Sequence, residues 1–88
     1  MNTHTMIIDV REPDEYNSGH VEGALNIPPA ELLAGSKQLN EVPKDKKIVV
    51  YCRTGSRSNA AIHVLQQMGF RNLTNGINAA HVAKHLTL

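Results

Sequence analysis

The sequence is poor in cysteine and in aromatic residues. Its 88 residues include one cysteine, one phenylalanine, two tyrosines and no tryptophan. A single cysteine excludes a disulfide within the chain, a Cys-x-x-Cys redox pair and a zinc site built from several cysteines. An unpaired thiol survives best in a reducing compartment, so we expect a cytoplasmic protein, or a periplasmic one if a signal peptide has been removed.

Long hydrophobic runs and an excess of one charge are also missing. The longest apolar runs are about five residues, too short for a membrane-spanning helix. The formal net charge is +1, with acidic and basic residues interspersed, which argues against a nucleic-acid or membrane-binding surface. Hydrophobic residues make up 41% of the chain, enough for one small core. We expect one monomeric domain over residues 1–88, with no membrane and no nucleic-acid partner.

Strand and helix patterns alternate along the chain, after four residues that we expect to be frayed. The predicted strands are residues 6–10, 24–27, 46–51 and 70–74. The predicted helices begin at Pro13 and Ala30 and then span 58–68 and 77–86, and Asn75-Gly76 is predicted to form a turn. Alternation predicts an α/β fold in which a small parallel sheet of about four strands carries helices on both faces.

The central predicted strand ends at Cys52, and a short polar loop follows it. A helix N-terminus and curled backbone N–H groups bind anions, and nearby cations favour a thiolate. Arg53 and Arg57 supply positive charge, Gly55 allows a tight turn, and Ser58 is the expected N-cap. No carboxylate lies between Ile48 and the end of the chain, so we expect nothing acidic in this part of the sequence to compete for the loop.

Two interpretations of Cys52 compete. A free cysteine is most often a buried core residue. The six residues after Cys52 are small, polar or cationic, however, and a core position does not need such neighbours. We therefore favour a reactive thiol, with the loop from Arg53 to Arg57 binding an anionic substrate.

Three segments together resemble the rhodanese family of sulfurtransferases, in that family's order and spacing. They are Asp9–Tyr16 (DVREPDEY), Gly19–Pro28 (GHVEGALNIP) and the loop Cys52–Ser58 (CRTGSRS). The resemblance implies a rhodanese-like fold with Cys52 as the catalytic residue. It also implies a substrate-binding loop formed by Arg53, Thr54, Gly55, Ser56 and Arg57. One region departs from the pattern: many members have Gly-Gly and a tryptophan where this chain has Asn75-Gly76 and no tryptophan.

The resemblance also implies a reaction. A thiosulfate or persulfide donor would give a Cys52 persulfide, and a thiol or cyanide would accept the sulfur, without a metal or other cofactor. The loop from Cys52 to Arg57 has six residues. Related phosphatases and arsenate reductases have one more, so the length favours sulfur over phosphate. A persulfide carrier and a non-enzymatic binding module on the same scaffold stay open as alternatives.

Five further polar residues receive structural interpretations. Asp9 and Arg11 stand at a strand end, where we expect them to brace loops through hydrogen bonds, and His20 is expected to brace a loop as well. His81 and His85 have a spacing that can bind a metal. Two histidines without a third ligand more often mark an exposed helix face.

Overall fold

The computed structural model describes residues 5–86, and side chains are described for residues 5–84. The expected frayed end, residues 1–4, lies outside this range. Four parallel strands form one sheet in the order β2-β1-β3-β4. They are β1 (Thr5–Asp9), β2 (Leu25–Asn26), β3 (Lys47–Cys52) and β4 (Leu73–Asn78). The predicted α/β fold with a four-stranded parallel sheet is therefore confirmed.

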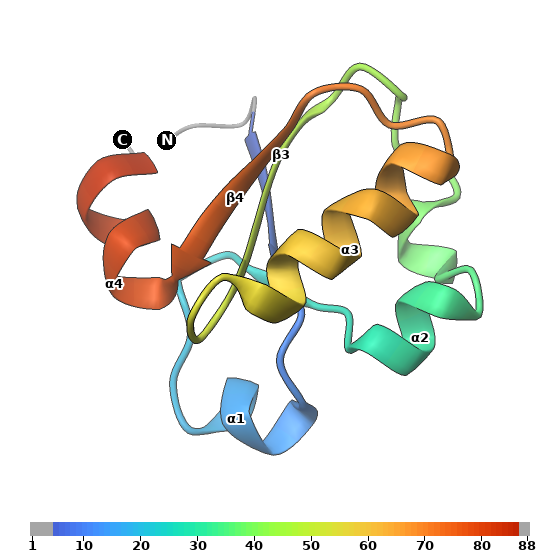
Figure 1. Cartoon of the computed structure of the whole chain (residues 1–88). Coiled ribbons are helices and arrows are strands. Elements are labelled where there is room, and N and C mark those ends of the chain that lie inside the picture. The colour runs from blue at the N-terminus through green and yellow to red at the C-terminus, as the bar shows by residue number, and fades with distance from the viewer. Residues whose placement is uncertain (1–4, 87–88) are drawn as a thin grey trace.

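Helices cover both faces of this sheet. The helical segments are α1 (Pro13–Asn17), α2 (Pro29–Leu33), the 3-10 helix η1 (Lys37–Leu39), α3 (Ser56–Gln67), α4 (Ala79–His81) and the π-helix η2 (Val82–Leu86). Figure 1 shows α2 and α3 on one side of the sheet and α4 on the other. None of the helices within residues 5–86 has the length and apolar character needed to cross a membrane.

The side chains of β3 point alternately to the two faces of the sheet, so the core has two layers. Ile48, Val50 and Cys52 pack with α3 residues such as Leu65, because successive strand side chains point to opposite faces. Val49 and Tyr51 face the other way, toward Val21, Ala24 and Val82. Cys52 therefore points to the face that α3 covers. The predicted apolar stripe of α3 is confirmed, with Ala61 and Leu65 buried and Val64 and Met68 half-buried.

Helix α3 begins two residues earlier than expected. The N-cap is Gly55, whose φ of 94° lies in the left-handed region that glycine adopts readily. The prediction of Ser58 as N-cap was wrong: Ser58 lies inside the first turns of α3 and is fully buried. The left-handed Gly55 turns the chain sharply enough for the helix to begin at Ser56.

The predicted turn at Asn75-Gly76 was also wrong. Both residues lie within β4, where Asn75 pairs with Val50 and Ile77 with Tyr51. Gly76 is the extra residue of this irregular pairing, as in a β-bulge. A Cβ at Gly76 would lie 2.5 Å from Val82 Cγ2 and 2.8 Å from Val49 Cγ1. Glycine is thus present because of close packing rather than chain reversal, and the last helix begins at Ala79 instead of Ile77.

Candidate active site

Cys52 is the last residue of β3, at the carboxyl edge where ligands bind in parallel sheets. The loop after it folds back over the sulfur. The amide of Gly55 donates to Cys52 Sγ at 3.1 Å, and the amide of Ser58 donates at 3.4 Å. The Ser58 hydroxyl oxygen lies 3.5 Å from the same sulfur. The residue is only 2% exposed, so backbone amides form most of the polar surroundings of the thiol.

These contacts change the acidity of the thiol. Burial raises the pKa of Cys52, because a thiolate is poorly solvated in the interior. Hydrogen bonds from the Ser58 hydroxyl and from the amides of Ser58, Thr54 and Gly55 lower it further than burial raises it. The net result is a pKa of about 7, so a large part of the protein carries a thiolate at neutral pH.

A carboxylate reaches the loop, contrary to expectation. Glu15 of α1 accepts two hydrogen bonds from the Arg57 guanidinium, at 2.7 and 3.0 Å. Arg53 lies 4.0 Å from the same carboxylate. The Arg57 hydrogen bonds, with a further one from the Glu12 amide, lower the pKa of Glu15 to about 2. The expectation of an uncompensated basic loop was wrong, because it considered only residues near Cys52 in the sequence.

Helix α1 holds Glu15 in this position. Glu12 is its N-cap and Pro13 its first residue, and the Glu12 amide donates to Glu15 Oε1 at 2.9 Å. This is a capping box, in which the residue three after the cap reaches back to the cap amide. The same carboxylate therefore caps α1 and pairs with Arg57. The signal in the sequence was an acidic residue in the first turn of a helix, which predicts a cap but no contact with a distant loop.

The other predicted loop residues lie around Cys52 with different exposures. The side chain of Arg53 is 70% exposed and that of Arg57 is 36% exposed. Thr54 and Ser56 are exposed, and Gly55 is half-buried. The end of β3, residues 53–55 and the start of α3 thus form one turn around the sulfur, with the Arg53 guanidinium toward solvent and that of Arg57 paired with Glu15.

Asp9 and Arg11 have the bracing role that the sequence predicted. The Arg11 guanidinium binds both oxygens of Asp9, the shortest contact being 2.7 Å, and also donates to the carbonyl of Gly19 at 2.6 Å. Tyr51 donates its hydroxyl hydrogen to Asp9 at 2.8 Å and accepts from the Val21 amide. Burial is the main reason that the pKa of Tyr51 is raised to about 12. This network connects β1 and β3 to the loop that precedes β2.

His20 also braces its loop. Its ring stacks on that of Tyr16, with centroids 3.6 Å apart, and its Nδ1 lies 2.8 Å from the Tyr16 carbonyl oxygen. Tyr16 in turn donates to the carbonyl of Ala24 at 2.6 Å. These contacts hold the segment between α1 and β2 in place.

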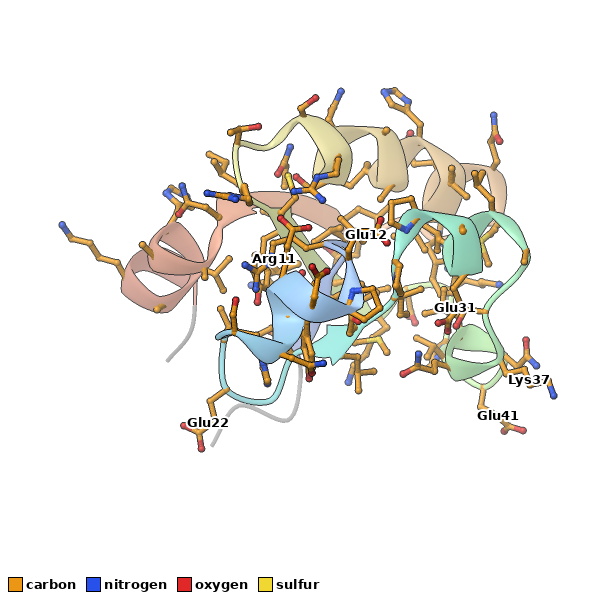
Figure 2. All side chains as sticks on the ribbon, turned by 90° about the horizontal axis from the view of Figure 1, so that it is seen from below. Arg11, Glu12, Glu22, Glu31, Lys37 and Glu41 are labelled. Atoms are coloured by element: carbon orange, nitrogen blue, oxygen red, sulfur yellow. The ribbon has the colours of Figure 1, made fainter. Side chains whose placement is uncertain are left out.

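Arg11 and several other charged residues differ in where they point. Figure 2 looks from below, toward the carboxyl ends of the strands, and shows Arg11 near the middle while Glu22, Lys37 and Glu41 extend outward.

Among residues with described placement, no three His, Cys, Asp or Glu side chains are grouped closely enough to hold a metal ion. The side chain of His85 is not among those described.

Comparison with protein families identifies the chain. Residues 1–82 match the model for the rhodanese-like domain. The chain belongs to this family. A solved structure, a rhodanese with anions from Escherichia coli, superposes with a TM-score of 0.78 at 34% identity and covers 90% of this chain and 92% of its own. The resemblance drawn from the three sequence segments is thereby confirmed.

Two curated relatives of this rhodanese-like domain are sulfurtransferases. The thiosulfate sulfurtransferase PspE of Escherichia coli (strain K12) is 39% identical over 69 residues, which cover 77% of this chain and 64% of PspE. A sulfurtransferase of Allochromatium vinosum is 34% identical over 70 residues, which cover 80% of this chain and 63% of the relative. The chain therefore spans somewhat less than two thirds of the length of either relative.

Proposed function

We propose that this rhodanese-like domain is a sulfurtransferase that carries sulfane sulfur on Cys52. The donor is thiosulfate or a persulfide, and the acceptor is a thiol or cyanide. The observation that carries this proposal is the convergence of the Gly55 and Ser58 amides on a sulfur whose pKa is about 7. The sulfurtransferase names of PspE and of the Allochromatium vinosum relative support it.

In the first step the Cys52 thiolate attacks the outer sulfur of thiosulfate. A bond forms between Cys52 Sγ and that outer sulfur, and the bond from the outer sulfur to the sulfonate sulfur breaks. Sulfite leaves with the electron pair of the broken bond, so no general acid is required. The product is a Cys52 persulfide, a covalent intermediate that divides the transfer into two steps.

The loop suits the charge changes of this step. A persulfide adds one sulfur to Cys52, and the terminal atom is anionic. Backbone N–H groups curled around an anion stabilise it without a formal charge of their own. The exposed guanidinium of Arg53 is placed to attract a dianionic donor, and it is 70% exposed.

In the second step the acceptor removes the terminal sulfur. Cyanide or a thiolate attacks that atom, a bond to the acceptor forms, and the bond between the two sulfurs breaks. The electron pair of that bond returns to Cys52 as a thiolate, so the loop regains its starting state. Cyanide gives thiocyanate and a thiol acceptor gives a new persulfide.

Intact mass spectrometry tests the proposal. Incubation with thiosulfate should add one sulfur atom to the protein, the added mass should map to Cys52, and cyanide should remove it. The Cys52→Ser protein is the matched control and should gain nothing. Because the chain has one cysteine, a sulfur adduct that persists in that variant would contradict the assignment of Cys52 as nucleophile.

The same experiment distinguishes the alternatives. An adduct from a small persulfide donor but not from thiosulfate would favour a persulfide carrier. Absence of an adduct from either donor on the folded protein would contradict sulfur transfer. Hydrolysis of an aryl phosphate would then test the phosphatase alternative, against which the six-residue loop argues.

A further inference from the structure

The side chain of Asn75 in β4 makes three hydrogen bonds, to Ser58, Gly55 and Ile77. Its Oδ1 accepts from the Ser58 hydroxyl at 2.6 Å and from the Ile77 amide at 2.9 Å. Its Nδ2 donates to the Gly55 carbonyl at 3.0 Å. The orientation of the amide is fixed, because an Asn carbonyl oxygen only accepts and its nitrogen only donates. Exchanging the two atoms would set donor against donor at Ile77 and acceptor against acceptor at Gly55.

This orientation decides where the Ser58 hydrogen lies. A serine hydroxyl has one hydrogen to donate, and here it points to Asn75 Oδ1. The lone pairs of Ser58 Oγ therefore face Cys52 Sγ, 3.5 Å away. In this arrangement a protonated thiol can donate to Ser58, whereas a thiolate receives no hydrogen from it. The lowering of the Cys52 pKa by the Ser58 hydroxyl therefore belongs to the rotamer in which its hydrogen has turned from Asn75 to the sulfur.

The backbone near Asn75 is strained, which indicates that the surrounding contacts hold it in this conformation. Ile77 has a φ of 72°, a conformation that β-branched residues rarely adopt. Strained residues of this kind persist where the surroundings hold them, and they cluster at functional sites. Asn75 supplies one such restraint through the Ile77 amide. The Ile77 side chain in turn lies beside Gly55, within 3.6 Å of the position that a Cβ there would occupy.

We propose that Asn75 is a positioning residue that competes with the Cys52 sulfur for the hydrogen of the Ser58 hydroxyl. It holds the loop through the Gly55 carbonyl and, by the same amide, favours the protonated thiol over the thiolate. This role rests on the proposed function, since it acts on the thiolate that would attack the donor.

Other charged groups near the thiol do not account for an effect of Asn75 on the ionisation of Cys52. Arg53 of the loop and Arg57 of α3 are arginines, which stay protonated. Glu15 of α1, with a pKa of about 2, stays ionised near neutral pH. The segment after β4 contains His81, Lys84 and His85 in the sequence, and a comparison of variants that share all three cancels their contribution.

A double-mutant cycle on the thiol pKa tests the competition. The four proteins are the wild type, Asn75→Ala, Ser58→Ala and the double variant, each titrated by thiolate absorbance near 240 nm. The Asn75→Ala change should lower the pKa more, or raise it less, when residue 58 is serine than when it is alanine. We expect a difference of at least threefold in the ionisation constant. Any general loosening of the loop cancels, because it affects both backgrounds.

Equal effects of Asn75→Ala in the two backgrounds would overturn the proposal, and so would a coupling of opposite sign. A measurement on the wild-type protein covers the case in which Asn75→Ala does not fold. The ¹³C shift of the Asn75 side-chain carbonyl should change with the midpoint of the thiol titration, as the Ser58 hydrogen moves to sulfur. The same signal should stay constant in Ser58→Ala. A constant signal in the wild type would refute the competition.

These titrations need no sulfur donor, so they separate this role from the proposed function. Coupling between Asn75 and Ser58 without any sulfur adduct on Cys52 would retain the positioning role and reject sulfur transfer. An adduct without coupling would retain sulfur transfer and reject the role of Asn75.

Discussion

The acidity of Cys52 gives the sharpest quantitative prediction. A pKa of about 7, compared with roughly 8.5 for a free cysteine, changes the thiolate population most at mildly acidic pH. At pH 6 the thiolate fraction is about 9% for the lower pKa and about 0.3% for the higher one. The population of the reactive form is thus roughly 30-fold larger in the folded protein.

Reactivity should rise by less than population does. A more acidic thiol gives a weaker nucleophile, with a Brønsted coefficient of about 0.4–0.5. A decrease of about 1.5 units in pKa therefore lowers the intrinsic rate roughly fivefold. The rate constant for nucleophilic attack by the Cys52 sulfur at pH 6 should be about six times that of free cysteine. At high pH its plateau should be about fivefold lower than that of free cysteine.

Two assays check these values independently. Thiolate absorbance near 240 nm, measured as the difference between the wild type and Cys52→Ser, gives the midpoint without requiring access to the sulfur. Persulfide formation from thiosulfate as a function of pH should show the same midpoint. A midpoint at or above 8.5 in the absorbance titration would refute the reasoning, since burial would then outweigh the amide hydrogen bonds.

The acidity also predicts a dependence of stability on pH. A thiol whose pKa is lower in the folded state than in the unfolded state stabilises the fold at high pH. That contribution is fully present above about 8.5 and is lost as the pH falls through about 7. Urea unfolding of the wild type and of Cys52→Ser should therefore diverge as the pH rises from 6 to 9, with the wild type gaining stability.

Three further predictions concern the groups around the site. Glu15→Gln removes a negative charge beside the loop arginines and should lower the KM for thiosulfate about two- to fivefold at low salt, with little effect at high salt. Glu22 is an outward-pointing carboxylate (Figure 2) and serves as the control. An equal decrease of KM in Glu22→Gln would contradict the prediction. Gly76→Ala places a Cβ 2.5 Å from a valine methyl group and should cost about 1–3 kcal/mol in urea unfolding, and an unchanged stability would show that β4 moves freely. Tyr51→Phe removes the hydroxyl bonded to Asp9 and should destabilise the fold by roughly 1–3 kcal/mol, whereas a neutral result would mean that water replaces the hydroxyl.

Local patterns in the sequence predicted the strand, loop and helix around Cys52. The β-branched run before Cys52, the polar loop and the apolar stripe of the next helix are each recognisable within about a dozen residues. Such patterns predict a strand, a turn and a helix because the forces that form them act between near neighbours. The placement of the thiol at the carboxyl end of β3 follows from this strand-loop-helix order.

The errors arose where distant segments meet. Glu15 contacts Arg57 across 42 positions of sequence, and its local pattern indicated only a helix cap. Asn75-Gly76 fits the local rule for a turn, but β3 supplies hydrogen-bonding partners along the whole segment. Sheet pairing therefore outweighed turn propensity, and the role of Asn75 depends on loop atoms that only the fold brings near it.

The contacts of Cys52 indicate different roles for the hydrogen-bond donors around the sulfur and for the two arginines. The groups that do most to lower the pKa of the thiol are the Ser58 hydroxyl and the amides of Ser58, Thr54 and Gly55. Arg57 is committed to Glu15 by two hydrogen bonds, so much of its charge is balanced before any substrate arrives. If Arg57 were the main stabiliser of the thiolate, pairing it with a carboxylate would work against that role. The Ser58 hydroxyl and the amides favour the thiolate, and the exposed Arg53 guanidinium faces the solvent from which, in the proposed reaction, an anionic donor must come.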